Sequence, residues 1–134
     1  MKVVCDEGVP RALGRRLREL GIEVSPPAPQ WRGFANGRLV AAAAAAGFDV
    51  LLSNDKNLIF QLNLLTMEIA IVTLPNNRRE SLVPRSEDIA DTLRRVLPGQ
   101  CVAIQTDGVR TLRRRGFGDA TVVDALPPIA PFSR

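Results

Sequence analysis

The chain has 134 residues, of which 46% are hydrophobic and 24% are charged, a balance typical of one globular domain. A chain of this length buries about two thirds of its unfolded surface, so we expect a core that needs neither disulfides nor a structural metal. The alanine-rich residues 39–48 fall short of the roughly 20 apolar residues that span a bilayer. Asp6 and Glu7 follow the start too closely for the apolar stretch of a secretory signal. We therefore expect a cytoplasmic protein that does not enter a membrane.

The charge balance favours a polyanionic partner. Eighteen lysines and arginines oppose fourteen acids, which gives a net charge of +4, and only Lys2 and Lys56 are not arginines. The planar guanidinium of arginine suits bidentate contacts with phosphate, as in nucleic acids. The sequence has no histidine, which excludes Ser-His-Asp and Cys-His triads, HExxH metalloprotease chemistry and histidine-rich zinc sites. Carboxylates are therefore the main candidates for acid–base or metal chemistry.

Short apolar runs alternate with helical patterns along most of the chain. The runs expected to form strands are residues 2–5, 22–25, 49–52, 69–74 and 101–105. The segments expected to form helices are residues 9–20, 36–47, 58–65 and 86–97. Asn36 and Ser86 are the expected N-caps of two of these helices. This alternation predicts βαβ units and an α/β fold, with a mainly parallel sheet covered by helices on both faces.

The C-terminal part departs from this alternation. The turn Asp107-Gly108 predicts that residues 109–112 return antiparallel to the fifth strand, at the edge of the sheet. Residues 116–134 contain glycine and proline and show no clear period. We expect a domain over residues 1–115, followed by a loose tail or an arm that contacts a partner.

Three acids are expected at one edge of the sheet. Asp6 and Glu7 follow the first strand and Asp55 follows the third, and ligands of parallel sheets bind beyond the carboxyl ends of the strands. Clustered carboxylates attract Mg²⁺ or Mn²⁺, which can activate water and stabilise charge during phosphodiester hydrolysis. Alternatively, Asp6 and Asp55 cap the helices that follow them. Asp49 begins the third strand, so we expect it at the opposite edge.

Three separated segments resemble the PIN-like proteins related to the Mut7-C nucleases. They are residues 3–10 (VVCDEGVP), residues 33–39 (GFANGRL) and residues 49–58 (DVLLSNDKNL). The resemblance covers about residues 1–105. It implies a three-layer α/β/α PIN-like fold and a Mg²⁺- or Mn²⁺-dependent ribonuclease site, in which the family's acids fall on Asp6, with Glu7 beside it, and on Asp55. It also implies membership in a toxin–antitoxin pair, an antitoxin protein as a partner, and self-association as a homodimer.

One position departs from the family pattern. Where many relatives carry an acid at the start of the helix after the second strand, this chain has Asn36. Asn36 offers an oxygen ligand without the negative charge, which weakens metal binding. Arg11, Arg15 and Lys56 are candidates for contacts with an RNA backbone, against the alternative that they belong to a solvated face or, for Lys56, that it shields the acids.

The leading hypothesis is a metal-dependent endoribonuclease. In this hypothesis Asp6 and Asp55 hold the ion, Asn36 is a further ligand, and Glu7 positions metal or water. The alternative is a non-catalytic RNA- or protein-binding module that kept the fold and lost the site. A phosphorylatable receiver-like domain also places acids after its first and third strands, but it needs a lysine after the fifth strand, which this sequence lacks.

Overall fold

A computed structural model describes residues 1–64 and 66–133 of the protein. The strands are β1 (Lys2–Cys5), β2 (Glu23–Ser25), β3 (Val50–Ser53), β4 (Ala70–Thr73), β5 (Cys101–Ile104), β6 (Arg110–Arg115) and β7 (Thr121–Leu126). The α-helices are α1 (Arg11–Glu19), α2 (Asn36–Ala45), α3 (Arg79–Leu82) and α4 (Ser86–Arg95). The 3-10 turns are η1 (Pro29–Trp31), η2 (Leu58–Gln61), η3 (Val83–Arg85) and η4 (Phe117–Asp119).

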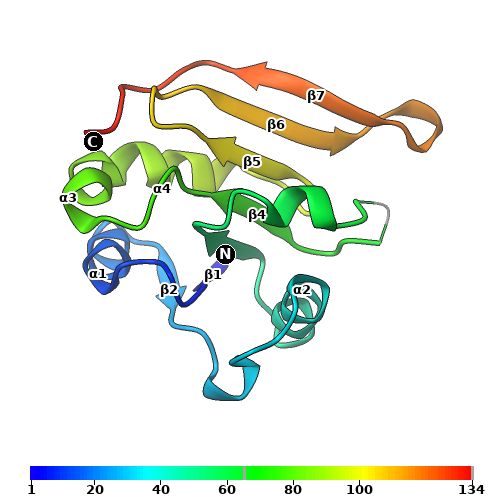
Figure 1. The fold of residues 1–134 in the computed structure, drawn as a ribbon, viewed down its shortest axis with the longest axis horizontal. Coiled ribbons are helices and arrows are strands. Elements are labelled where there is room, and N and C mark those ends of the chain that lie inside the picture. Colours follow the sequence, from blue (N-terminus) through cyan, green and yellow to red (C-terminus); the bar gives the residue numbers. More distant parts are fainter. Residues whose placement is uncertain (65, 134) are drawn as a thin grey trace.

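All described strands form one sheet in the order β2-β1-β3-β4-β5-β6-β7. The first five strands of this order pair in parallel, and β5, β6 and β7 pair antiparallel. Helices α1, α3 and α4 cover one face of the sheet, while α2 and η2 cover the other (Figure 1). The predicted α/β fold, with its three layers, mainly parallel sheet and C-terminal antiparallel hairpin, is confirmed.

The sheet divides the apolar core into two parts because successive side chains of a strand point to opposite faces. Val3 and Cys5 pack in the core beneath α1 and α4, whereas Val4 packs in the core beneath α2. Leu51 of β3 also packs on the α2 side. The same alternation directs Ser53, two residues further along β3, toward the α2 side of the sheet.

The first helix follows its sequence pattern closely. Leu13 and Leu17 are fully buried against the sheet, and Pro10 directly precedes the helix, where its missing N–H costs nothing. The chain leaves α1 through Gly21, whose φ of +91° lies in the left-handed region, and glycine adopts this conformation without strain.

Several predicted details are wrong. Asn36 and Ser86 do not cap their helices; each is the first helical residue, and Ala35 and Arg85 occupy the N-cap positions. The helix expected over residues 58–65 is the single 3-10 turn η2, with residue 65 outside the described residues. Helix α3, which has only four residues, was not predicted. η2 and α3 have four residues each, too few for an apolar period to identify them.

The loose tail predicted over residues 116–134 is also wrong for the residues described. β7 pairs with β6 from Arg110↔Leu126 to Arg115↔Thr121, so β6 lies inside the sheet and no domain boundary falls at residue 115. The segment that follows is fixed as well: the Arg110 guanidinium donates to the Pro127 carbonyl at 2.7 Å, and Phe132 is only 4% exposed. Arg134 lies outside the described residues. No helix in residues 1–64 or 66–133 is both long and apolar enough to cross a bilayer.

Candidate active site

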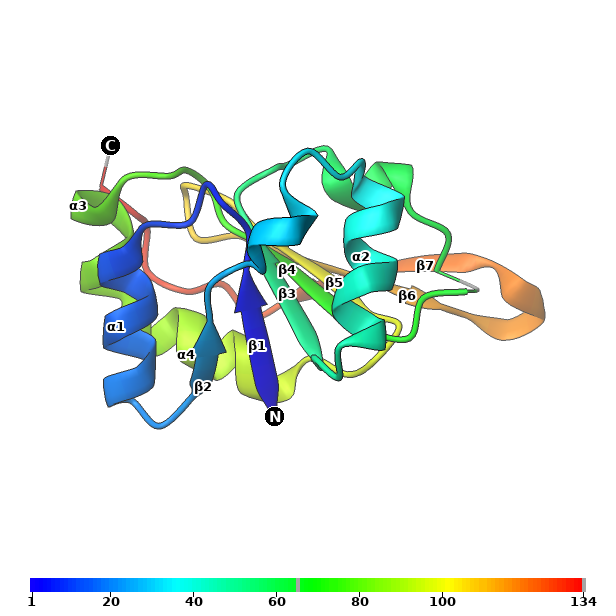
Figure 2. The same ribbon diagram turned by 90° about the horizontal axis from the view of Figure 1, so that it is seen from below.

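The two aspartates predicted for the site lie at the carboxyl ends of neighbouring strands. β1 and β3 are adjacent, and the order of the parallel strands reverses its direction between them. Such a switch point is where open α/β sheets bind their ligands. The backbone N–H of Asp6 donates to the Leu52 carbonyl at 2.8 Å, which extends the strand pairing by one residue. The carboxyl end of β1 and the start of α2 lie at the same edge of the sheet (Figure 2).

A buried hydroxyl connects these two aspartates. Ser53, the last residue of β3, is fully buried. Its Oγ donates to Asp6 Oδ2 at 3.0 Å and accepts the backbone N–H of Asp55 at 3.1 Å. The loops after β1 and β3 are therefore fixed relative to each other. Ser53 was not among the predicted site residues; its signal is a serine that ends a buried strand two residues before a candidate acid.

The loops that carry the aspartates are also closely packed. A Cβ atom added to Gly8 would lie 2.3 Å from Oδ1 of Asn54, so glycine allows this approach. Asp6 Oδ1 accepts the N–H of Glu7 at 2.7 Å, and Asp55 Oδ1 accepts the N–H of Asn57 at 2.9 Å. These bonds fix the rotamers of both carboxylates.

The alternative role of the aspartates as helix caps does not fit Asp6, because the N-cap of α1 is Pro10, with no side-chain hydrogen bond. It fits Asp55 in part: its Oδ1 accepts the N–H of Asn57 and its carbonyl accepts the N–H of Leu58, so it caps the turn that leads into η2, whose own N-cap is Asn57. Asp49 lies at the opposite edge, as expected, where its carboxylate accepts the backbone N–H of Lys2 at 2.7 Å.

Glu7 is joined to Asp6 only through its backbone. Its side chain is exposed, and Oε1 lies 3.9 Å from Nε of Arg32, which is even more exposed. A solvated pair at this distance contributes little to stability. The Glu7 carboxylate is thus beside the site and free to change its rotamer.

Asn36 and Gln61 are held together by a hydrogen bond between their side-chain amides. This bond connects the first residue of α2 to the last residue of η2, the turn that follows Asp55. Within residues 1–64 and 66–133, no group of three or more histidines, cysteines, aspartates or glutamates could hold a metal ion. The acidic part of the site therefore consists of Asp6 and Asp55, and Ser53 bonds the carboxylate of the first and the backbone N–H of the second.

The predicted basic residues occupy two different places. Lys56 lines a cavity of about 450 Å³ with Thr73, the last residue of β4, and Gln105, which follows β5. No lysine follows β5, so the receiver-like arrangement is absent there. Arg11 and Arg15 line another cavity, of about 270 Å³, beside β2 on the face that α1 covers. The structure therefore places Lys56 at the carboxyl edge and separates it from the two arginines.

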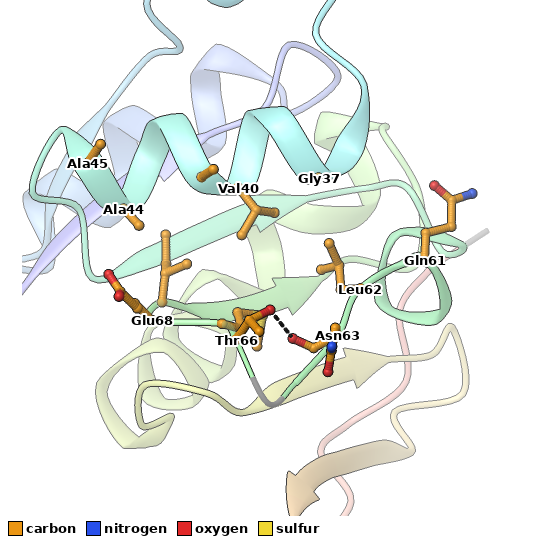
Figure 3. Close-up of a pocket in the computed structure, with 12 residues that line it drawn as sticks. Gly37, Val40, Ala44, Ala45, Gln61, Leu62, Asn63, Thr66 and Glu68 are labelled. Atoms are coloured by element: carbon orange, nitrogen blue, oxygen red, sulfur yellow. Dashed lines mark hydrogen bonds between the residues drawn. The ribbon is translucent and has the colours of Figure 1, made fainter.

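A further cavity of about 490 Å³ lies between α2 and the segment that leads to β4 (Figure 3). Val40, Ala44 and Leu62 give this cavity a largely apolar lining, and Gln61 lies at its rim. Neither Asp6 nor Asp55 lines it. This cavity is therefore separate from the two aspartates.

The two cysteines are free and buried. Burial raises the pKa of the Cys5 thiol to about 12; Arg18 opposes this shift and Asp6 adds to it. Burial also raises the pKa of Cys101 to about 12, opposed by Arg113. A thiol with such a pKa is protonated at neutral pH, and the thiolate is the nucleophile. Neither cysteine is a candidate for nucleophilic catalysis.

Comparisons with protein-family models, with curated proteins and with solved structures find no match to this chain. Its class therefore rests on the fold and the site: an α/β protein with a pair of aspartates, joined by a buried serine, at the switch point of its sheet.

Proposed function

We propose that the protein is a metal-dependent endoribonuclease in which Asp6 and Asp55 hold a Mg²⁺ or Mn²⁺ ion. The observation that carries this proposal is the Ser53 hydroxyl, which bonds the Asp6 carboxylate and the Asp55 backbone at the carboxyl edge of the sheet. This edge, next to the switch point, is where an α/β sheet binds its ligand. The positive net charge supports RNA as the substrate.

The donor set fits a magnesium-type ion. Mg²⁺ is commonly bound by one or two carboxylates, keeps several waters and is completed by substrate phosphates, so a third acid is not required. The described hydrogen bonds use one lone pair of each Asp6 oxygen and one of Asp55 Oδ1, and carboxylates have further lone pairs. Among the described residues, no lysine or arginine forms an ion pair with Asp6 or Asp55.

Each residue of the site has a distinct role in this proposal. The bound ion would activate a water molecule and neutralise charge that develops on the scissile phosphate. Ser53 holds Asp6 in place, and the Asn36 amide is a further oxygen donor. Glu7 is exposed and accepts a proton from water or positions it. Lys56, next to Asp55 in the chain, binds a phosphate of the RNA.

The proposal also assigns roles to two basic residues of α1 and to protein partners. Arg11 and Arg15, both exposed on α1, bind phosphates away from the cleaved bond. The resemblance to PIN-like proteins supports a role as the toxin of a toxin–antitoxin pair, in which the partner is an antitoxin protein and the active species is a homodimer.

The test is Mn²⁺ binding, measured by calorimetry in a phosphate-free buffer, followed by cleavage of a labelled single-stranded RNA. We expect the wild type to bind Mn²⁺, and Asp6→Asn and Asp55→Asn to lose both binding and cleavage. Asp49→Asn is the matched control, because this acid lies at the opposite end of β3. A folded wild type that binds no Mn²⁺ contradicts the proposal, as does equal loss in the Asp49 variant.

A non-catalytic RNA-binding module is the second candidate function. The observation that favours it is the lack of a group of three acids among the described residues, with Asn36 bonded to Gln61. Such a module would bind RNA without metal and would keep this affinity in Asp6→Asn and Asp55→Asn. Cleavage by the wild type that disappears in both variants excludes it.

A further inference from the structure

An aromatic side chain is exposed close to the proposed site. Phe60 belongs to η2 and is 67% exposed, whereas its neighbours Leu58 and Ile59 are buried in the core beneath α2. The two buried residues fix the turn, so the Phe60 ring is held at the surface on a rigid support. An exposed phenylalanine contributes little to folding and offers its ring to a ligand.

A guanidinium group lies over this ring. The carbon Cζ of Arg113 is 4.5 Å from the centre of the Phe60 ring, a cation–π geometry. Arg113 is on β6, so two segments that are distant in the sequence build the pair. The following two arginines pair with carboxylates instead: Arg114 with Asp124 at 2.7 Å and Arg115 with Asp119 at 3.9 Å.

Phe60, the aromatic member of this pair, borders the cavity at the carboxyl edge. Phe60 lines this cavity of about 450 Å³ together with Lys56 and Thr73, and the volume is within the range of small-molecule sites. Thr73 is the register partner of Ser53, whose hydroxyl bonds Asp6. The cavity therefore lies one strand away from Asp55, which follows β3, and two strands away from Asp6, which follows β1.

The lining of the cavity contains several polar side chains beside its apolar ones, and it is not strongly acidic. Gln105 and Thr106 offer hydrogen-bonding groups, and Lys56 offers a positive charge. Asp107 is the one acid among the lining residues, and its Oδ1 accepts the N–H of Val109 at 3.0 Å, which holds it in the turn between β5 and β6. A ligand with an aromatic ring, polar edges and a phosphate matches these groups.

We infer that the cavity is a nucleotide subsite that stacks an unpaired base of single-stranded RNA on the Phe60–Arg113 pair. Lys56 contacts the phosphate of this nucleotide, and the strand continues past Thr73 toward Asp6 and Asp55. The inference rests on the proposed function, because it takes RNA as the substrate. The inference also predicts a preference for single-stranded RNA. The bases of a duplex are already stacked and paired, so they are not available to stack on the Phe60 ring.

The experiment measures binding of a fluorescent single-stranded RNA by anisotropy in the presence of EDTA, so that no metal is needed and no cleavage occurs. Phe60→Ala is expected to weaken binding about tenfold and Phe60→Trp to preserve it, because stacking requires an aromatic face. The salt dependence of binding should not change in Phe60→Ala, whereas Lys56→Gln, which removes the proposed phosphate contact, should reduce its slope. The wild type should bind the single strand more tightly than the matching duplex.

Phe117→Ala is the matched control, because this phenylalanine is fully exposed in η4 and does not line the cavity. Unchanged RNA affinity in Phe60→Ala overturns the inference, and so does an equal loss in both alanine variants or no binding by the wild type. The outcome is separate from that of the nuclease proposal. If RNA binding depends on Phe60 but the protein shows no Mn²⁺-dependent cleavage, the nuclease proposal is wrong and the nucleotide subsite is supported.

Discussion

The hydroxyl of Ser53 donates a hydrogen bond to Asp6 Oδ2 at 3.0 Å. The two residues are 47 positions apart in the chain, and the bond connects the end of β3 to the residue that follows β1. The same hydroxyl oxygen of Ser53 accepts the N–H of Asp55 at 3.1 Å. Ser53 is fully buried, so water cannot replace it without a change in the packing of the sheet. The geometry of both aspartates therefore depends on one side chain that carries no charge.

Ser53→Ala should weaken Mn²⁺ binding about tenfold, since loss of a group that orients a metal ligand typically costs 10- to 100-fold in affinity or activity. The lost hydrogen bond should also lower the free energy of unfolding by about 1 kcal/mol. Calorimetry and urea denaturation measure the two effects. Ser81→Ala is the control: this serine is also buried and accepts a hydrogen bond from Asn76 at 2.9 Å, away from the site. Equal Mn²⁺ affinity in the two variants would show that Ser53 does not position Asp6.

Phe132→Ala should lower the free energy of unfolding by about 3 kcal/mol, because the ring is only 4% exposed and packs in the core beneath α1 and α4. Phe117→Ala removes the same ring from a fully exposed position, and its effect should stay within about 0.5 kcal/mol. Urea denaturation of both variants measures the difference. If the two variants are equally stable, the segment after β7 does not belong to the folded core.

The parallel strands β1, β3, β4 and β5 could be predicted because strands buried on both faces are nearly continuous apolar runs. In β3, Val50 and Leu51 face opposite cores and are both apolar. β7 could not be predicted in this way, because it is a half-exposed strand whose apolar neighbours Val122 and Val123 break the alternation that a one-sided strand shows. It is identified only by its pairing with β6, which is a tertiary interaction.

The positions of Asp6 and Asp55 could be predicted because topology alone brings the carboxyl ends of parallel strands to one edge. The role of Ser53 could not, since a serine near a candidate acid does not show that its hydroxyl reaches Asp6, 47 positions away in the chain. The pairing of Phe60 with Arg113 also could not be predicted, because it joins η2 to β6 through the fold and not through local sequence. Contacts between distant segments are set by packing, which a single sequence does not display.

Gly108→Ala should be strongly destabilising. At this glycine φ is +89°, and an added Cβ would lie 2.0 Å from the carbonyl oxygen of Ile129, a backbone atom that cannot move aside cheaply. Gly47→Ala is a close control, because its φ is +88° and nothing lies within 4 Å of the added Cβ. We expect a loss of about 1 kcal/mol for Gly47→Ala, from backbone strain alone, and a clearly larger loss for Gly108→Ala. Thermal denaturation compares them, and equal losses would contradict the close contact between Gly108 and Ile129.

The buried thiols should make the protein less stable at alkaline pH. Burial raises the pKa of Cys5 and Cys101 from 9.0 to about 12, so between these values the unfolded chain releases thiol protons that the folded chain retains. The free energy of unfolding contributed by each thiol is therefore fully present below pH 9, and it falls by about 1.4 kcal/mol per pH unit as the pH rises toward 12. Urea denaturation between pH 9 and about 12 should compare the wild type with the double variant Cys5→Ala, Cys101→Ala. Lysine and arginine titrate in both proteins, so the difference between the two curves reports the ionisation of the thiols. The double variant should start less stable because it loses buried sulfur atoms, and its stability should fall less steeply with pH. Parallel curves for the two proteins would show that the thiols ionise equally in the folded and unfolded states.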